Sequence, residues 1–181
     1  MPAQPEIAST DERTLIAQAA SGSHAALAAL FELHSTHVHC IAYRLTMSAD
    51  EADDVVQDLF IGLPEALSAF SGTGDFSAWI RKVAIRTTLM RMRSTKRRVA
   101  TALRADSERE TAMSNFLLDR MAIATALAAL PNNLRVVFML RYVEGYTHAE
   151  IAGLLGIRAG TAEVRLHRAR RKLRALLRDS G

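Results

Sequence analysis

Residues 146–173, YTHAEIAGLLGIRAGTAEVRLHRARRKL, decide the fold of the second half of this chain. Thr147 is a favourable N-cap and Glu150 completes a capping box, so a short helix is predicted to begin here. Gly156 would end that helix in a tight turn, and a second helix is predicted over about residues 160–177. Two helices separated by a glycine turn form a helix-turn-helix pattern.

The predicted second helix has one apolar stripe and is otherwise strongly basic. Between Arg158 and Arg178 the sequence has eight lysines and arginines but a single acid, Glu163. A solvated helix normally mixes both signs, so this one-signed charge favours neutralisation of DNA phosphates. Residues 161–168 would then lie in a major groove, while a helix that is basic only for solubility is the alternative. The apolar stripe follows steps of three and four: Ala162, Leu166, Ala169, Leu173 and Leu176.

Composition limits the class of protein. The 181 residues are 49% hydrophobic with few aromatics, which is typical of one or two small domains of helices packed through Ala and Leu. The single cysteine, Cys40, excludes an internal disulfide and fits a reducing cytoplasm. The sequence shows neither a signal peptide nor an apolar stretch of membrane-spanning length, so we expect a cytoplasmic protein without membrane insertion.

Helical periodicity extends over most of the chain, and the fold class is therefore predicted as all-α. We expect two small helical domains joined by a flexible linker, the second being the helix-turn-helix domain. Pro64 is expected to kink or restart the helix that contains it. The predicted segments are a disordered lead-in at 1–10, helices near 12–20, 24–45, 48–65 and from Phe76 onward, a linker at 99–115, and further helices near 116–130 and 134–143.

A histidine-rich segment, residues 34–40, superficially resembles a metal site. On a helix, however, its spacing leaves only two rough ligand pairs, and no second Cys/His pair occurs to complete a four-ligand zinc site. We therefore predict no metal and no cofactor. Histidines on the helix surface and a buried small thiol at Cys40 are expected instead.

The predicted helix at 48–65 is acidic, with six acids and no Lys or Arg. Acids in its first turn complement the helix dipole and need no functional explanation. Asp54, Gln57 and Asp58 lie at i, i+3 and i+4, so they form one polar patch. DNA would repel this patch, which therefore predicts either a basic protein partner or merely a solvated face.

The next predicted helix joins two aromatic residues to a basic tract. From Arg81 to Arg98 there are eight lysines and arginines and no acid. Aromatic residues interleaved with basic ones favour single-strand binding, through stacking and attraction to the backbone. Trp79 as the core aromatic of a small domain is the alternative. The candidate strand-binding residues are Phe76, Trp79, Arg81, Lys82 and Arg86.

The chain resembles the extracytoplasmic-function (ECF) group of bacterial sigma factors. The resemblance runs from about Glu12 to Leu177 and is carried by ADDVVQDLF, FSAWIRKVA, ALPNNLRVVFMLRYVEGYTHAEIAGLLGI and GTAEVRLHRARRKL. It implies a promoter-specificity subunit of RNA polymerase. A region 2-like domain at 11–98 would serve core binding and the minus-ten element, and a region 4-like domain at 116–181 would serve the minus-thirty-five element.

The resemblance also implies a role for each candidate set. Asp54, Gln57 and Asp58 match the family's core-binding helix, which docks on a coiled coil of the largest polymerase subunit. Residues 70–75 and the helix from Phe76 match the part that engages the melted minus-ten strand. The expected minus-thirty-five contacts are Arg158, Thr161, Glu163, Val164, Arg165, Arg168 and Arg171.

Four residues depart from the family's usual pattern, and they bear on the promoter sequence rather than on the class. Pro64 stands where Trp is usual and Arg86 where Asn is frequent. Met90 replaces a common Asp, and Glu163 replaces a residue that is usually basic.

The expected partners are core RNA polymerase, promoter DNA and an anti-sigma factor, with no small-molecule substrate. The sequence shows no glycine-rich phosphate loop and no nucleophile with a placed base, so an enzyme is not predicted. The alternative function is an operator-binding helix-turn-helix regulator whose N-terminal domain senses a ligand or dimerises. A protein-binding adaptor that never contacts DNA is a third hypothesis.

Overall fold

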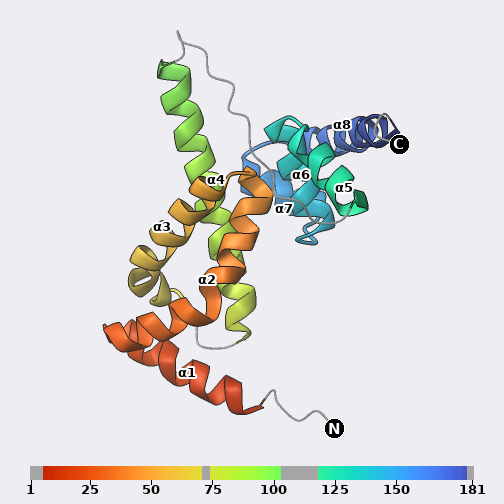
Figure 1. Cartoon of the computed structure of the whole chain (residues 1–181). Coiled ribbons are helices and arrows are strands. Elements are labelled where there is room, and N and C mark those ends of the chain that lie inside the picture. Colours follow the sequence, from red (N-terminus) through yellow and green to blue (C-terminus); the bar gives the residue numbers. More distant parts are fainter. Residues whose placement is uncertain (1–5, 71–73, 103–117, 179–181) are drawn as a thin grey trace. The chain divides into compact units, whose positions relative to one another are not determined.

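Helices account for every secondary-structure element in the described part of the chain. The structure is a computed structural model, and it describes residues 6–70, 74–102 and 118–178. The all-α class predicted from periodicity is confirmed. The elements, shown in Figure 1, are α1 Glu6–Ala20, α2 His24–Thr46, α3 Ala49–Leu67, α4 Phe76–Ala102, α5 Leu118–Ala128, α6 Asn132–Tyr142, α7 His148–Leu155 and α8 Ala159–Arg178.

Contacts within the chain divide it into two compact units, as the sequence predicted. The first comprises residues 1–43 and 48–91, and the second comprises the remainder. The predicted linker at 99–115 begins too early, because α4 continues as helix to Ala102. The rest of that predicted linker lies outside the described residues.

The start of the chain also differs from the prediction. α1 begins at Glu6, inside the stretch 1–10 that was expected to be disordered. In the sequence Pro5 directly precedes this helix, and neither Pro nor Gly follows before Gly22. Proline favours the first helical positions, so the local sequence permits the earlier start.

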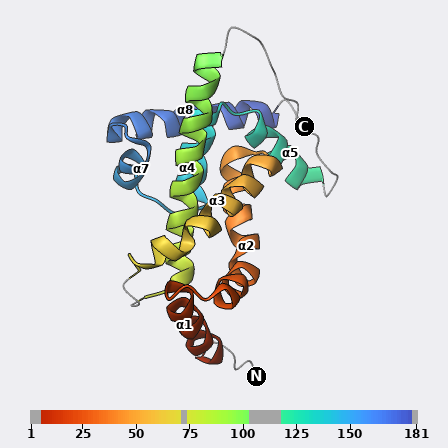
Figure 2. The same ribbon diagram turned by 90° about the vertical axis from the view of Figure 1, so that its left-hand side faces the viewer.

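The first unit is organised around the inward faces of four helices. α1 packs against α3, and both views of the chain show α4 running beside α2 and α3 (Figures 1 and 2). Burying one large aliphatic side chain contributes about 1.5–3 kcal/mol, so burial of these inward faces stabilises the unit strongly. The fully buried large side chains of this unit include Leu30, Val38, Ile41, Val55, Leu63, Ile80 and Ile85.

α3 begins as predicted but does not break at its proline. The Ser48 side chain accepts a hydrogen bond from the Glu51 amide at 3.3 Å, which confirms the N-cap. Pro64 lies inside the helix, which continues to Leu67, so the helix does not restart there. A proline this close to a helix end costs little, because few following residues depend on the lost hydrogen bond.

The helix-turn-helix prediction is confirmed by local chemistry. Thr147 and Glu150 form a reciprocal capping box at the start of α7. Gly156 adopts the left-handed conformation with φ 65° and ψ 38°, which few residues other than glycine adopt without strain. The amide of Ile157 then donates to the carbonyl of Ala152 at 3.0 Å and closes the turn.

α8 is held by a narrow stripe of small and branched aliphatic side chains. It packs against α5, α6 and α7, and Figure 2 shows α7 near one end of α8 and α5 near the other. Ala126 and Leu130 meet the stripe from the α5 side. Its buried residues are Ala162, Leu166, Ala169 and Leu173, as the three-and-four spacing predicted.

The histidine-rich segment of α2 is arranged differently from the prediction. His34 is buried rather than on the surface, and its Nε2 lies 2.9 Å from Oε1 of Glu12. Cys40 is exposed rather than buried. The helical period explains both, because His34 lies four residues from Leu30 and from Val38 on the core face, whereas Cys40 does not.

The described ranges contain neither a cluster of metal-ligating residues nor a membrane-spanning helix. No group of three or more metal-ligating side chains occurs there. In the same ranges, no helix combines the length and the apolar character needed to cross a bilayer.

Substitutions at two glycines test the account of the turn. Gly156→Ala should destabilise the second unit by about 1–2 kcal/mol, because a Cβ is strained in the left-handed conformation even where no atom crowds it. Gly153→Ala is the matched control, since its surroundings are equally open and its backbone is helical; it should stabilise α7 by about 0.5–1 kcal/mol. Hydrogen exchange of α7 and α8 amides in the full chain measures both, and changes of the same sign would contradict the account.

Candidate protein and nucleic-acid interfaces

The acidic patch on α3 is bridged by an arginine of the same unit. Arg91 of α4 donates from Nη1 to Oδ2 of Asp58 at 2.5 Å and from Nη2 to Oδ2 of Asp54. The side chains of Arg91, Asp54 and Asp58 are 32%, 48% and 49% exposed, so the group lies at the surface. Gln57, the third member of the predicted patch, is also exposed. The structure therefore brings Asp54, Gln57 and Asp58 together as predicted and adds a cation to them.

The electrostatics of this group follow from its partners. Burial alone would lower the pKa of Arg91, but the hydrogen bond and charge of Asp58, with those of Asp54, raise that pKa above its ordinary value. The guanidinium is therefore charged at any physiological pH. With two carboxylates and one guanidinium, the patch keeps a formal charge of about −1 at neutral pH.

The inward position of Arg91 could have been predicted from the helical period of α4, although this residue was counted only as one of eight basic residues. Ile80, Ala84 and Thr88 are buried on α4 at steps of four. Arg91 follows Thr88 by three residues and so continues this inward row. An arginine in that row must reach an acid on a neighbouring helix or remain unpaired at the edge of a core.

Three aromatic residues form one cluster where α3 ends and α4 begins. The ring centroids of Phe70, Phe76 and Trp79 lie 5.2–5.4 Å apart in every pair. The Phe76 ring also lies edge-on to His34, with centroids 5.2 Å apart.

The burial of this cluster separates two of the predicted strand-binding residues. Phe76 is 2% exposed, so its ring has no free face for a base, and the expectation that it stacks on a base is not supported. Its ring partners explain this burial: His34 comes from α2, Phe70 from the segment after α3, and Trp79 from α4 itself. Trp79 is partly exposed and stacks on Phe76, so it combines a packing role with partial access to solvent.

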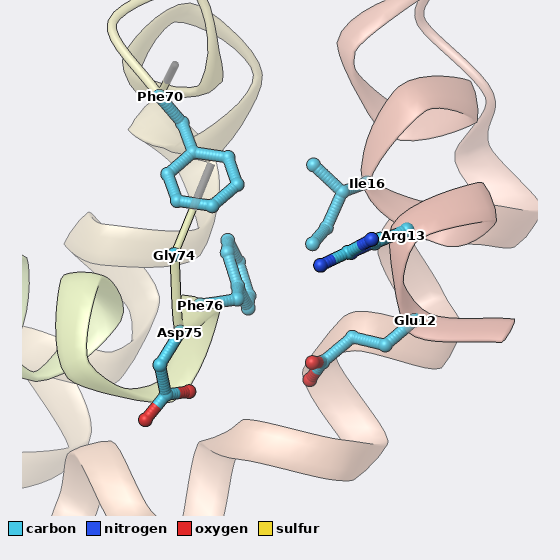
Figure 3. Close-up of a pocket in the computed structure, with 7 residues that line it drawn as sticks. All are labelled: Glu12, Arg13, Ile16, Phe70, Gly74, Asp75 and Phe76. Atoms are coloured by element: carbon cyan, nitrogen blue, oxygen red, sulfur yellow. The ribbon is translucent and has the colours of Figure 1, made fainter. Parts of the chain in front are cut away.

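A small cavity lies beside this cluster, between α1 and the segment before α4 (Figure 3). Its volume is about 340 Å³, and Figure 3 shows Glu12 and Arg13 reaching from α1 toward the opposite wall. Asp75 on that wall accepts a hydrogen bond from the amide of Ser77 at 2.9 Å, which caps the start of α4. The described lining residues are Glu12, Arg13, Ile16, Phe70, Gly74, Asp75 and Phe76.

The basic residues of α4 do not all share one face. Lys82 and Arg86 are exposed and lie one turn apart, so they form an outward row. Met90, 67% exposed, continues that row. Arg81 is partly buried and lies on a different side of the helix. The structure thus groups Lys82 with Arg86 and separates Arg81 from them.

On α8 the predicted contacts occupy the side opposite the buried stripe and its two flanks. Val164 is 50% exposed and lies with Arg168 and Arg171 on the outward side. Thr161 and Arg165 are partly buried at the edge of the stripe. The exposed predicted contacts are Arg158, Glu163, Val164, Arg168 and Arg171.

Comparison with known proteins assigns both units. The family model described as Sigma-70 region 2 matches residues 30–98, and the one described as Sigma-70, region 4 matches residues 120–173. The ECF RNA polymerase sigma factor SigL of Mycobacterium tuberculosis is 34% identical over 171 residues, covering 92% of this chain and 97% of SigL. SigW of Bacillus subtilis, another ECF sigma factor, is 28% identical over 178 residues, covering 91% and 95%.

Solved structures agree with this assignment. CnrH in complex with the cytosolic domain of CnrY is 31% identical, with a TM-score of 0.55 and coverage of 94% of this chain and 99% of CnrH. RpoE in complex with the anti-sigma factor NepR, from Bartonella quintana, shares the fold with a TM-score of 0.60 at 24% identity, covering 82% and 94%.

The two matched regions define a sigma factor of the sigma-70 type. The chain belongs to the ECF RNA polymerase sigma factors, as the sequence resemblance implied. It is therefore a DNA-binding initiation factor that works with core RNA polymerase at promoters. The two alternative functions, an operator-binding regulator and a protein-binding adaptor, are therefore set aside.

The half-exposed ion pair should contribute little to folding. Arg91→Met and the double variant Asp54→Asn with Asp58→Asn should each change the free energy of unfolding of the first unit by less than about 1 kcal/mol. Urea unfolding followed by the fluorescence of Trp79, the only tryptophan, measures this. Leu59→Ala, on the buried face of α3, is the control and should cost about 2–5 kcal/mol. A loss near that of the control for Arg91→Met would show that the pair maintains the fold.

Proposed function

We propose that the two units divide the work of an alternative sigma factor between three helical surfaces. The α3 patch binds core RNA polymerase, the outward row of α4 binds the melted minus-ten strand, and α8 binds the minus-thirty-five element. The observation that carries this proposal is the segregation of charge, with an acidic face on α3 and basic outward faces on α4 and α8. The factor acts in the cytoplasm and supplies no catalytic step of its own.

The acidic patch is suited to a basic protein surface. Asp54 and Asp58 each use only Oδ2 for Arg91, so their Oδ1 atoms can accept hydrogen bonds from a partner. The exposed amide of Gln57 adds a donor and an acceptor beside them. DNA phosphates would be repelled here, whereas a basic coiled coil of the polymerase would be attracted.

The outward row of α4 is suited to an unpaired strand. Lys82 and Arg86 can follow the phosphate backbone, and the partly exposed Trp79 can contact a base. Base stacking on an aromatic ring contributes about 1–3 kcal/mol per base where the ring is accessible. Phe76 supports this surface from beneath rather than contacting the strand.

The outward face of α8 is suited to the major groove. Arg168 and Arg171 can bind phosphates or guanine, and the exposed methyl groups of Val164 can contact a thymine methyl. Glu163 lies on a flank of the helix, where its carboxylate can accept from the amino group of cytosine. In the described part of the chain Glu163 makes no hydrogen bond or ion pair that would occupy it.

Control by an anti-sigma factor is part of the proposal. CnrH, 31% identical over nearly the whole chain, was solved in complex with the cytosolic domain of CnrY. A protein that covers these surfaces would hold the factor away from polymerase and promoter until it is released.

Neutralising the acidic patch tests the polymerase-binding surface. Asp54→Asn together with Asp58→Asn keeps the side-chain shapes but removes both charges, so affinity for core RNA polymerase should fall by at least about tenfold. Competition with the unmodified factor for purified core polymerase measures the affinity. Asp53→Asn is the control for loss of an acidic charge on α3, because Asp53 faces His39 at 3.3 Å and not Arg91. Unchanged competition by the double variant would leave the patch as a solvated face.

Two residues of α8 should affect DNA recognition in different ways. Glu163→Ala should change the preferred base at one minus-thirty-five position, since a carboxylate paired with a base discriminates by about 1–3 kcal/mol. Arg168→Ala should weaken binding to all sequences and lower the salt slope by about one if it contacts a phosphate. Holoenzyme binding to a promoter library at two salt concentrations measures both. An unaltered base preference for Glu163→Ala would exclude the base contact.

A further inference from the structure

The acidic patch, which is proposed to bind basic residues of the polymerase, already binds one cation of its own chain, the guanidinium of Arg91. The guanidinium of Arg91 lies between the carboxylates of Asp54 and Asp58 and donates to both. It uses two different nitrogens, one for each carboxylate. Any basic side chain that approached the same pair of Oδ2 atoms would have to share or replace these hydrogen bonds.

The position of Arg91 distinguishes it from the other basic residues of α4. Lys82 and Arg86 lie on the outward row, where the proposed strand binding takes place. Arg91 lies instead in the row of Ile80, Ala84 and Thr88, which faces the neighbouring helices. It is therefore directed to the α3 patch by the helical period and is not part of the outward basic row.

The exposure of the group allows the pair to open. All three side chains are between about one third and one half exposed, so water can solvate each charge when they separate. A fully buried pair would leave an uncompensated charge in the core on opening. The pair is thus stable enough to be occupied in the free factor and weak enough to be displaced by a partner.

We propose that Arg91 is an internal competitor for the polymerase-docking patch, and that it raises the selectivity of docking for partners that present cations to both Asp54 and Asp58. The proposal rests on the polymerase-binding function of that patch. A partner with a single lysine would recover only one of the two hydrogen-bonded contacts that it displaces. A partner with two suitably spaced cations, or with one well-placed arginine, would recover both.

Removing the competitor should therefore strengthen docking. Arg91→Met keeps the bulk of the side chain but leaves two uncompensated carboxylates, so the patch charge changes from about −1 to about −2. The association rate with purified core RNA polymerase should rise by about three- to tenfold at low salt, and the gain should shrink as the Debye length falls from about 10 Å at 0.1 M to about 3 Å at 1 M salt. Arg91→Lys, with a point charge in place of the planar fork, should show a smaller gain.

A matched variant separates this local effect from a change in net charge. Arg13→Met also removes one positive charge, but Arg13 lines the cavity beyond the C-terminal end of α3. From Asp54 to that helix end at Leu67 is about 20 Å, at about 1.5 Å per residue. Its effect on the association rate should be well below that of Arg91→Met.

A double-mutant cycle decides between the possible outcomes. In the background of Asp54→Asn with Asp58→Asn, Arg91→Met should no longer change docking, because neither of the two carboxylates that Arg91 contacts remains. If the two asparagine substitutions leave polymerase affinity unchanged, the proposed function of the patch fails. If they weaken docking but Arg91→Met leaves the affinity unchanged or lowers it, the competitor proposal is overturned while the patch function stands.

Discussion

Burial of a narrow apolar stripe on each helix is the constraint on which the structure depends. On α8 the stripe consists of Ala and Leu at steps of three and four, and its burial against α5, α6 and α7 turns the basic residues outward. The same constraint operates in the first unit, where the inward faces of α3 and α4 are aliphatic. Charge segregation is therefore a consequence of helical packing: once the stripes are buried, the acids of α3 and the bases of α8 have only the surface left to occupy.

The α3–α4 pair shows how this constraint links the two proposed binding activities of the first unit. α4 supplies the outward row proposed to bind an unpaired strand, yet its inward row ends in Arg91, which contacts the acids of α3. Residues that are distant in the sequence thus bring together the proposed polymerase-docking patch and its internal cation. Half-exposed ion pairs stabilise folds weakly, so this contact is better suited to tuning an interaction than to maintaining the unit.

Features set by local chemistry could be predicted from the sequence, and features set by pairing between helices could not. Thr147 and Gly156 specify a cap and a left-handed turn by themselves, so the helix-turn-helix was recognisable. The helical period places His34 on the core face of α2, whereas the local group of histidines suggested a surface position. The burial of Phe76 depends on partners in α2 and in the segment after α3, and the pairing of Arg91 depends on acids 33 and 37 residues away in the chain, so neither follows from local sequence.

Transcription by a reconstituted holoenzyme is the most direct measurement of the central claim, that acidic and basic helical faces jointly connect polymerase to a promoter. Purified factor and core RNA polymerase would be combined on fragmented genomic DNA, and transcript 5′ ends would be mapped. The account predicts discrete start sites that require both components, each preceded by shared minus-ten and minus-thirty-five sequences. Footprints by the factor alone, with no new start sites when core polymerase is added, would contradict it.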